Sequence, residues 1–351
     1  MPSNLVPDFL IKINGSPLSD DQAGDIASLI VYDDISAPSM AEIQLQTFDR
    51  AQHKFKWVDE SIFAEGNPIT VSMGYVDSAL KEVFSGEIIG IELDITMDSP
   101  PMMLIRAFDR RHRLMRGRKT RTFTKMKDSE IASKIASETG LSGQVTDTSI
   151  KHDYVLQHNQ SDIDFLRDRA ERIGYEVLVT DRKLVFRPIE LDQSSGITLD
   201  WESDLIEFYA RTNNIGQVGK VAVRGWDVNK KEAIISEASR ASKDLGSKKG
   251  YATADSAFGS AEMVSTMRPL LTKAEGDKIA SGQHTHMSLS YMTAEGLCEG
   301  RTDLITGKTV EISNMGKRFS GDYYLTEITY SIRPSEGFLT AFTARRNATN
   351  G

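Results

Sequence analysis

The chain has 351 residues, of which 39% are hydrophobic and 26% charged, a composition typical of folded proteins and unlike disordered or fibrous chains. At about 150 residues per domain, this length predicts roughly two to three domains. Acidic residues (50) outnumber lysine and arginine (42), and the net charge of −8 excludes a protein whose main task is gripping nucleic acid phosphates.

Cysteine usage and hydropathy exclude further classes. The single cysteine, Cys298, rules out an intrachain disulfide framework and a cysteine-rich metal site, and it indicates assembly in a reducing compartment. No apolar run approaches the about 18 residues needed to cross a bilayer. Residues 1–4 lack a basic patch followed by an apolar region, so we expect neither a membrane span nor a secretory signal.

Residues 1–118 are predicted to form a β domain. Phe9, Ile11 and Ile13 alternate with outward residues and lead into Asn14-Gly15, the strongest short hairpin signal. No segment of helical period precedes about residue 110, so an antiparallel sheet or barrel is expected. Further period-two runs cover 41–45, 69–73, 84–93 and 102–108.

Residues 119–190 are predicted to form a small α/β domain. Asp128 is expected to cap a helix that ends at Gly140, where the glycine supplies the stop. A second helix is expected from its cap at Ser161 to Gly174, with an apolar stripe on one face. A hairpin over 175–186 follows.

Residues 191–351 are predicted to form a second β domain with an insertion at about 236–284. The segment 236–262 is rich in Ser, Ala, Lys and Gly, which predicts a mobile linker or a poorly packed helix. A helix is expected from Pro269 to Gly282, after which Met287, Leu289 and Tyr291 alternate as a strand. Other strands are predicted at 205–209, 221–226, 310–313, 323–332 and 338–343.

An internal repeat links the two ends of the chain. Residues 84–111 align with 319–346 at a constant offset of 235, with seven identities over 28 positions where about two are expected by chance. The segment 66–72 also resembles 307–313, at an offset of 241. We predict two related β domains, in which Gly86 and Gly321 serve the same bend. The clearest identities are Phe84, Ser85 and Gly86 against Phe319, Ser320 and Gly321.

The sequence contains no clear candidate residues for catalysis, for cofactor binding or for metal binding. His284 and His286 could share one face of a strand, but two ligands are too few for a metal, and an exposed turn is the favoured interpretation. Cys298 has acidic neighbours, which favours a buried apolar filler over a reactive thiolate. The adjacent carboxylates Asp20-Asp21 and Asp33-Asp34 resemble solvated turns more than the acid and base of a hydrolase.

A basic segment is the sharpest charge feature of the sequence. The segment is either a docking surface for an acidic partner or for passing nucleic acid, or a strand exit whose cations pair with carboxylates elsewhere in an acidic assembly. We weigh the two interpretations equally. The interface candidates are Arg110, Arg111, Arg113, Arg116, Arg118, Lys119 and Arg121, flanked by Arg106, Lys125 and Lys127, with His112 among them.

The chain resembles the hub proteins of contractile phage tails and related injection machines, namely the late control gene D family and the hub part of VgrG-type spikes. The pattern Gln157-His158-Asn159-Gln160-Ser161-Asp162 followed by Phe165-Leu166 is fairly specific to that family. The resemblance covers essentially the whole chain. Matching stretches are 110–114, 154–166, 170–175 and 316–324.

This resemblance implies an α+β, β-dominated fold with two tube-like antiparallel β-barrel domains and a small α/β domain between them. It implies a homotrimer whose six barrels form a ring, which matches a six-fold tail tube to a three-fold spike and nucleates tube assembly. Tail tube, spike and other baseplate proteins are the expected partners, and DNA or protein cargo would pass through the lumen.

The expected location is a virion or extracellular contractile particle assembled in the bacterial cytoplasm. Because the sequence stops seven residues after Ala344, the spike is expected to be a separate protein. The resemblance carries over no catalytic residues and no cofactor.

Two other functions stay open at this point. One is a tail-tip cell-wall hydrolase or peptidase, which requires convergent carboxylates or a metal. The other is a monomeric cargo-binding or receptor-binding module. The hub interpretation requires that the two ends of the chain follow the same strand path, because only a duplicated unit lets a trimer present six equivalent units.

Overall fold

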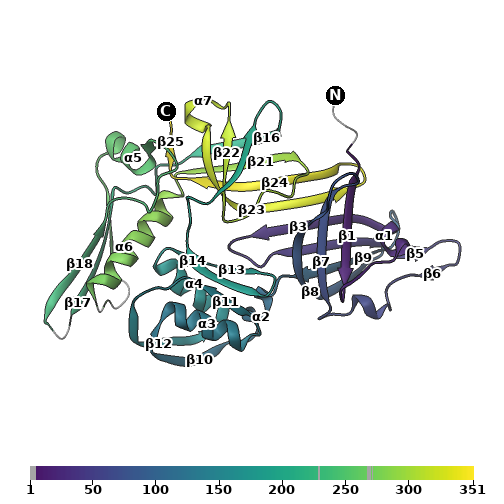
Figure 1. Ribbon diagram of the computed structural model, residues 1–351, viewed down its shortest axis with the longest axis horizontal. Coiled ribbons are helices and arrows are strands. Elements are labelled where there is room, and N and C mark those ends of the chain that lie inside the picture. The colour runs from purple at the N-terminus through teal and green to yellow at the C-terminus, as the bar shows by residue number, and fades with distance from the viewer. Residues whose placement is uncertain (1–4, 228–229, 267–269, 271) are drawn as a thin grey trace.

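A computed structural model describes residues 5–227, 230–266, 270 and 272–351. The fold is α+β and dominated by antiparallel strands, which confirms the predicted fold class. Figure 1 shows two β units side by side, a small α/β unit below them and a helical insertion at the end away from the first unit. No helix among the described residues is long and apolar enough to cross a membrane.

The first β unit contains the described residues from 5 to about 110. Alternating apolar residues of its strands point to one side and form the first half of the main core, as the period-two pattern predicted. Asn14 and Gly15 have positive φ angles and form the expected tight turn between β1 and β2. Its elements are β1 (Pro7–Ile13), β2 (Ser16–Pro17), α1 (Asp20–Gly24), β3 (Ile26–Asp34), β4 (Met40–Gln46), β5 (Phe48–Asp49), β6 (Lys54–Phe55), a 3₁₀ turn (Ser61–Phe63), β7 (Pro68–Tyr75), β8 (Lys81–Asp94) and β9 (Met102–Phe108).

The second β unit is formed by strands from the C-terminal half of the chain. Its apolar side chains join the same core cluster as those of the first unit. Its elements are β15 (Ser194–Asp200), β16 (Leu205–Thr212), β21 (Met292–Glu299), β22 (Thr309–Ser313), α7 (Gly316–Phe319), β23 (Gly321–Arg333), β24 (Gly337–Arg346) and β25 (Ala348–Thr349).

One continuous sheet runs through both units. Its strand order is β16-β21-β24-β23-β3-β4-β9-β8-β7-β1-β2, with β22 beside the first half of β23 and β15 beside β22. The two units are therefore fused edge to edge at β3 and β23, where two separate barrels were expected. Among the described strands, the pairing forms an open path that closes neither unit on itself.

The α/β unit has its own core, in which helices α3 and α4 contribute most of the buried side chains. Leu114 already belongs to this core. Ser161 caps α4 through the backbone N–H of Asp164, as predicted, whereas Asp128 is the first residue of α3 instead of its cap. The elements are α2 (Arg111–Met115), β10 (Lys119–Lys127), α3 (Asp128–Glu138), β11 (Ser142–Val145), β12 (Lys151–Gln160), α4 (Asp162–Arg172), β13 (Tyr175–Thr180) and β14 (Lys183–Pro188).

A buried hydrogen-bond network attaches the α/β unit to the second β unit. The Tyr324 hydroxyl donates to the Glu176 carboxylate over 2.6 Å, and Arg187 Nε donates to the same carboxylate over 2.8 Å. Burial, reinforced by the nearby Glu176 charge, raises the pKa of Tyr324 well above its usual value. The hydroxyl therefore stays protonated and holds the two units together.

An insertion between β16 and β21 forms a third packed unit. Helix α6 covers the three-stranded sheet and shares a small core with it, including Val221, Ile234 and Ile279. The insertion contains β17 (Lys220–Asp227), β18 (Glu232–Ala238), β19 (Lys248–Lys249), α5 (Gly250–Phe258), β20 (Glu262–Ser265) and α6 (Lys273–Ser288).

Two sequence predictions in the insertion are corrected. For 236–262 the predicted alternatives were a mobile linker and a poorly packed helix, and the segment contains helix α5. Segment 236–262 folds against the C-terminal segment, because Asn347 bonds the backbone of Lys243 and Leu245, contacts that low hydrophobicity does not reveal. Helix α6 continues past Gly282 to Ser288, so the strand predicted at 287–291 is absent. Gly282 lies directly against Gly174, which follows the end of α4, and a side chain at position 282 would collide with the Gly174 backbone. Pro269 lies outside the described residues.

Candidate functional site: the sheet junction and its open edges

The two β units follow the same strand path. In the first unit the hydrogen-bonded order is β7-β8-β9-β4-β3, and in the second it is β22-β23-β24-β21-β16, with antiparallel pairing throughout. The outer strands differ, because β1 pairs antiparallel with β7 whereas β15 pairs parallel with β22. Five strands in the same order are thus present twice in one chain.

The long hairpin of each unit has the same irregularity. Ile88 pairs with Ala107 just before a bulge in β8, and Leu325 pairs with Ala344 just before a bulge in β23. These equivalences place the two hairpins 237 residues apart, since Ala344 follows Ala107 by that number. A bulge at the same point bends both strands in the same way.

A glycine turn enters each hairpin at the same place. The Gly66 N–H donates to the Ile88 carbonyl over 2.7 Å, and the Gly307 N–H donates to the Leu325 carbonyl over 2.9 Å. Both glycines have positive φ, at 90° and 75°. Gly307 follows Gly66 by 241 residues, which is the offset that the sequence repeat assigned to this segment.

The second hairpin of each unit is also equivalent. Ile26 pairs with Leu45 before a bulge in β3, and Leu205 pairs with Cys298 before a bulge in β16. Cys298 thus occupies the core position that Leu45 fills in the first unit. It is buried, and desolvation raises the pKa of its thiol to about 12, so the thiolate is absent at neutral pH.

The matching triplets of the sequence repeat are displaced by two residues in the structure. Gly86 pairs with Ile69, whereas Gly321 pairs with Ile312, which is not the equivalent strand position. The two positions also require glycine for different reasons. Gly86 leaves room for the Phe108 carbonyl, whereas Gly321 has a φ angle of 128° and lies beside Arg346. The offset of 235 is therefore corrected to 237 by the pairing. The neighbouring triplet residues are Phe84 and Ser85 in β8, Phe319 at the end of α7 and Ser320 just after it.

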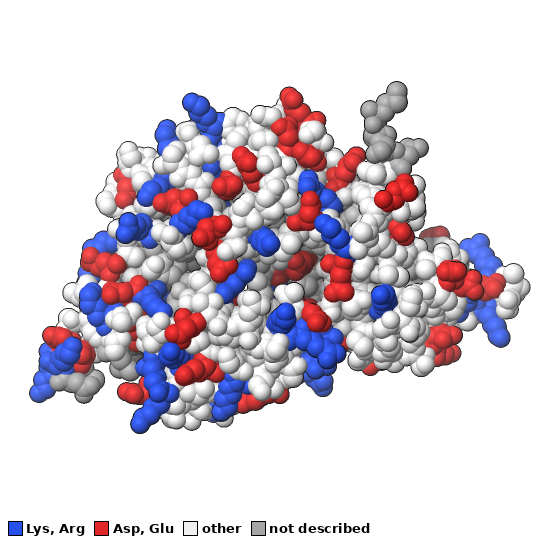
Figure 2. Space-filling view, viewed as in Figure 1, with Lys and Arg blue, Asp and Glu red and all other residues white. Residues whose placement is uncertain are grey.

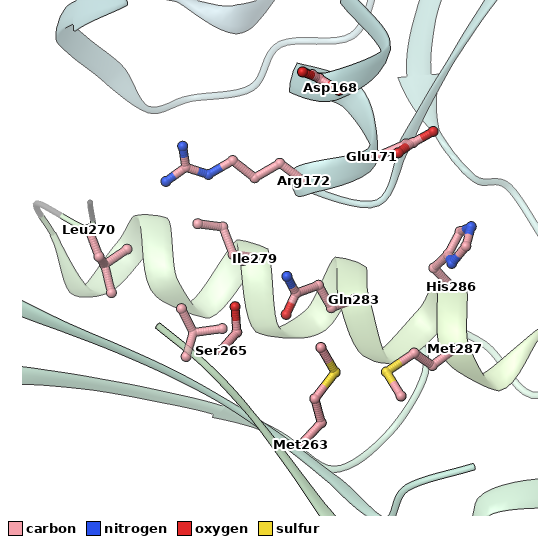
Figure 3. A pocket seen from close by; sticks show the side chains of 11 residues that line it. Asp168, Glu171, Arg172, Met263, Ser265, Leu270, Ile279, Gln283, His286 and Met287 are labelled. Atoms are coloured by element: carbon pink, nitrogen blue, oxygen red, sulfur yellow. The ribbon is translucent and has the colours of Figure 1, made fainter. Parts of the chain in front are cut away.

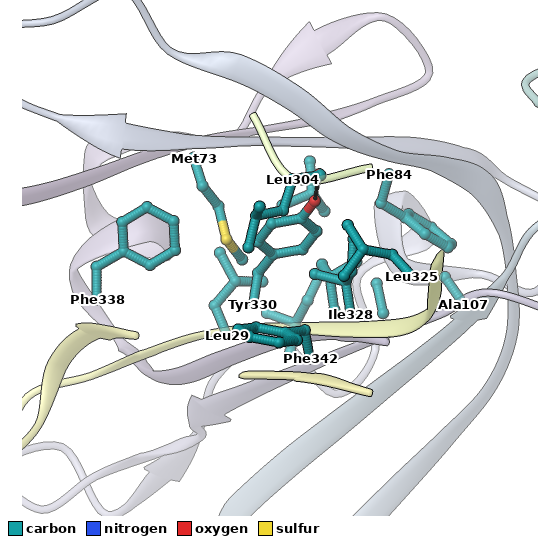
Figure 4. Close-up of a cluster of buried hydrophobic side chains, with 14 of the residues drawn as sticks. Leu29, Met73, Phe84, Ala107, Leu304, Leu325, Ile328, Tyr330, Phe338 and Phe342 are labelled. Atoms are coloured by element: carbon teal, nitrogen blue, oxygen red, sulfur yellow. Dashed lines mark hydrogen bonds between the residues drawn. The ribbon is translucent and has the colours of Figure 1, made fainter. Parts of the chain in front are cut away.

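The junction between the units is a regular antiparallel pairing. Residues 29–34 of β3 pair with residues 327–332 of β23, and the Ile35 N–H donates to the Thr326 carbonyl over 3.1 Å. Figure 4 shows Leu29 and Met73 of the first unit packed against Tyr330 and Phe342 of the second. The Tyr330 hydroxyl donates to the Leu304 carbonyl over 2.7 Å within this cluster. The core is therefore continuous across the junction.

Among the strands that the structure describes, two edges equivalent to this junction are open. The first half of β8 pairs with β7, but from residue 89 onward β8 pairs with β9 alone. Strand β16 pairs with β21 alone. In the internal junction, the second half of β23 corresponds to the second half of β8, and strand β3 corresponds to strand β16. An unpaired strand edge exposes backbone donors and acceptors that favour pairing with another strand.

The face of the continuous sheet that points away from the core carries an excess of acidic residues. Alternation along the strands assigns each residue to this face or to the core, and the exposed groove around Ala27, Glu42 and Arg333 lies on it. On β3, β4, β9, β16, β21, β24 and the second halves of β8 and β23, the acidic residues of this face are Asp34, Glu42, Glu92, Asp94, Glu207, Glu295, Glu299 and Glu327, and the basic residues are Arg106, Arg211, Arg333 and Arg345.

The basic segment lies between the first β unit and the α/β unit, and carboxylates pair with most of it. Arg110 bonds Asp181 over 2.9 Å, and Arg113 donates to Glu87 over 2.9 Å from Nε. Figure 2 shows cationic and acidic side chains interspersed on the visible face. Further pairs are Arg106 with Glu42 and Glu92, Arg111 with Asp109, Lys119 with Asp162, Arg121 with Asp162 and Glu138, and Lys127 with Asp147.

These contacts favour the pairing interpretation over the docking one. Arg118 donates to the Asn159 carbonyl over 3.1 Å. Within the described ranges, no carboxylate partner is recorded for Arg116 or Lys125, and both are exposed. Docking by the segment as a whole stays a prediction without a structural observation of its own.

Glu87 is the centre of the paired cations. It accepts hydrogen bonds from Arg113 and from His112 Nε2, and Arg110 Nε lies 3.3 Å from it. Burial by itself raises the pKa of this carboxyl, but the hydrogen bonds from Arg113 and His112, together with the charges of Arg113 and Arg110, outweigh burial and lower it. Glu87 therefore joins β8 to α2 as an ionised group.

The two candidate histidines lie on helix α6, not on a strand. Residues two apart on a helix point about 200° away from each other, so the pair cannot share one metal. His284 is buried edge-on against Tyr251, with ring centroids 4.9 Å apart, and burial lowers its pKa. In the part of the chain that the structure describes, no group of three or more His, Cys, Asp or Glu is arranged for a metal ion.

A groove of about 310 Å³ separates α4 from α6 and β20. Figure 3 shows Met263, Met287 and Ile279 on one side and Asp168 and Glu171 of α4 on the other. Asp168 accepts a hydrogen bond from the Gln160 amide over 2.8 Å. The sequence reasoning missed this groove, because it forms between two units that are distant along the chain.

Comparison with solved structures identifies the fold. The 43 kDa tail protein of prophage MuSo2 from Shewanella oneidensis is similar with a TM-score of 0.73 at 13% identity, covering 97% of this chain and 98% of that one. The tail protein from Neisseria meningitidis MC58 gives 0.68 at 11%, covering 97% and 96%. The c3393 protein of E. coli, described as a component of the type VI secretion system, gives 0.61 at 14%, covering 96% and 77%.

The chain therefore has the fold of phage tail proteins, a fold that a type VI secretion component shares. Residues 3–334 match the family model described as the Alg8 N-terminal domain, and the chain belongs to that family. No curated protein matches the sequence. The family description states no activity, and structural likeness at such low identity shows the fold alone, so the function is inferred from the geometry.

Proposed function

We propose that the chain is a structural component of a phage tail or related injection system, in which three copies form the hub ring between tail tube and spike. The observation that carries this proposal is the duplicated β unit fused edge to edge at β3 and β23. Three chains with two equivalent units each supply six, the number that a six-fold tube requires.

The unduplicated parts of the chain suit the opposite side of the ring. The α/β unit and the insertion occur once per chain, so a trimer presents each of them three times. Three-fold partners, such as a separate central spike, would meet these parts, whereas tube subunits and other baseplate proteins would meet the repeated β units. The assembly thus adapts one symmetry to the other by duplication of one element only.

The acidic face of the sheet fits a conduit for cargo. We assign this face to the lumen, where carboxylates repel nucleic acid phosphates and let DNA or protein pass without tight contacts. The role is mechanical, so the proposal assigns no catalytic residue and no cofactor. Assembly would take place in the bacterial cytoplasm, with the mature particle as the final location.

Native mass spectrometry tests the proposal. We expect a species three times the 39.0 kDa mass of the chain, and six-fold rings of tube subunits on one side of it when tail tube protein is added. A parallel assay would measure release of soluble fragments from purified cell walls, for which we expect no activity. A persistent monomer that degrades cell walls would overturn the hub in favour of a tail-tip hydrolase.

A further inference from the structure

The internal junction specifies how two copies of the chain join. We propose that the second half of β8 pairs antiparallel with β16 of a neighbouring copy, in the register by which β23 pairs with β3 inside one chain. This inference rests on the proposed ring and adds the residues that close it.

The two open edges are the exact counterparts of the two paired ones. The bulge equivalence relates β23 to β8 by 237 residues, so that Thr329 corresponds to Glu92. The other bulge relates β16 to β3 by 179 residues, so that Tyr32 corresponds to Arg211. Thr329 pairs with Tyr32 across the internal junction. The same pairing between two chains sets Glu92 opposite the partner subunit's Arg211.

Side-chain exposure follows the same correspondence. Tyr330 is 4% exposed inside the junction, whereas its counterpart on the open edge of β8, Leu93, is 47% exposed. Ile30 is 8% exposed, whereas its counterpart on the open edge of β16, Tyr209, is 61% exposed. Positions that the internal junction buries are thus apolar and uncovered at the open edges, as expected for surfaces that a second copy covers.

The backbone directions also agree. The Asn213 N–H donates to the Tyr291 carbonyl, so the N–H groups of Phe208, Ala210 and Thr212 point to the open side of β16. Their counterparts in β3 are Leu29, Val31 and Asp33, which face β23, since the Ile35 N–H donates to it. These alternating donors and acceptors are the groups that a neighbouring β8 would satisfy.

Charges across the proposed junction are complementary. Glu92 and the partner subunit's Arg211 would form a pair without direct backbone hydrogen bonds, the arrangement in which facing side chains lie closest. In the isolated chain, Glu92 already bonds Arg106, and Arg211 Nε donates to Thr293 over 3.0 Å. Glu92 would thus lie between Arg106 of its own chain and the partner subunit's Arg211.

Disulfide trapping tests the register. Asp94 would lie opposite the partner subunit's Tyr209 in a close pair whose geometry permits a disulfide. We expect Asp94→Cys/Tyr209→Cys to yield covalent dimers and trimers on mild oxidation, as read on non-reducing gels. The matched control, Asp94→Cys/Arg211→Cys, shifts the register by two residues and is expected to cross-link at least ten-fold less. The native Cys298 is buried and does not compete.

Charge exchange is an independent test that leaves the strands intact. We expect Glu92→Arg and Arg211→Glu each to weaken trimer formation at least ten-fold, measured by analytical ultracentrifugation. The double variant is expected to recover most of the loss, because it restores opposite charges across the junction. A double variant that is no better than the singles would overturn the proposed contact.

The outcomes separate this inference from the proposed function. A trimer that resists cross-linking between 94 and 209 while the shifted pair cross-links would overturn the register and leave the hub proposal standing. A chain that stays monomeric at high concentration and with tube protein present would overturn both. A trimer with the expected cross-link supports both.

Discussion

Single residues in this protein act mainly by joining units that are distant in sequence. Glu87 of β8 binds Arg113 and His112 of α2, and Glu176 of β13 binds Tyr324 of β23. Both carboxylates are buried, so the loss of either would remove a charged acceptor that several partners share across a unit interface. The unit interfaces are therefore sensitive to single substitutions.

Glu87→Gln is expected to destabilise the protein by about 2 kcal/mol near neutral pH, because it removes the charged acceptor that Arg113 and His112 share and leaves Arg110 with Asp181 as its carboxylate partner. The pKa of Glu87 is lowered in the folded state, so its stabilisation is complete above the ordinary value of 4.5 and is lost as the pH falls through the lowered pKa. The difference between wild type and variant in urea unfolding should therefore shrink below about pH 4.5. A constant difference down to pH 2 would contradict this.

Gly86→Ala is expected to destabilise the first β unit by about 1–3 kcal/mol, because the added Cβ collides with the backbone carbonyl of Phe108, which cannot move without breaking the sheet. The control is Gly24→Ala, where no atom lies within 4 Å of the new Cβ. Thermal unfolding of both variants checks this, and equal melting temperatures would refute the steric role of Gly86.

Elements of this chain divide into those fixed locally and those fixed by their neighbours. Helix α4 has a cap, an apolar stripe and acidic residues in its first turn, all within one stretch of sequence. Helix α6 continues past Gly282, and this glycine serves the close contact with Gly174 instead of marking the end of the helix. A local signal predicts the first helix well and misplaces the end of the second.

Ser161→Ala is expected to reduce the stability of α4 by about 1 kcal/mol, because the Ser161 hydroxyl accepts the otherwise unpaired N–H of Asp164. Hydrogen exchange of the α4 amides measures this loss. The same substitution at Ser137, an exposed position inside α3, is the control and should leave exchange unchanged or slower. Equal effects at both positions would rule out the cap.

The whole molecule has one core shared by two β units and separate cores for the α/β unit and the insertion. Because residues 29–34 of β3 pair with residues 327–332 of β23 and both strands pack into one cluster, the two β units are expected to unfold together. The unit of stability is thus larger than the unit of duplication.

Leu29→Ala tests this cooperativity. It is expected to cost about 3 kcal/mol and to reduce hydrogen-exchange protection equally in β4 of the first unit and β24 of the second. Ile135→Ala, in the core of the α/β unit, is the matched control and should spare both strands. Loss of protection confined to the first unit after Leu29→Ala would mean that the junction does not couple the units.

The sequence by itself determined the parts of this protein that depend on near neighbours. Alternation of apolar residues located many strands of the two β units but missed β3, β10 and β12, and Asn14-Gly15 located the first turn. The likeness between 66–72 and 307–313 revealed the duplication, with the correct offset for that segment. These signals are local because backbone turns, caps and strand faces are decided by residues a few positions apart.

Only the tertiary structure decided which strand lies beside which. The fusion of β3 to β23, the pairing of the basic segment with Glu87 and Asp162, and the order of segment 236–262 all depend on contacts between residues far apart in the chain. A strand pattern fixes which side chains face the core but leaves the partner strand and its register open. The bulges at 89 and 326 set that register, and they exist only once the strands are paired.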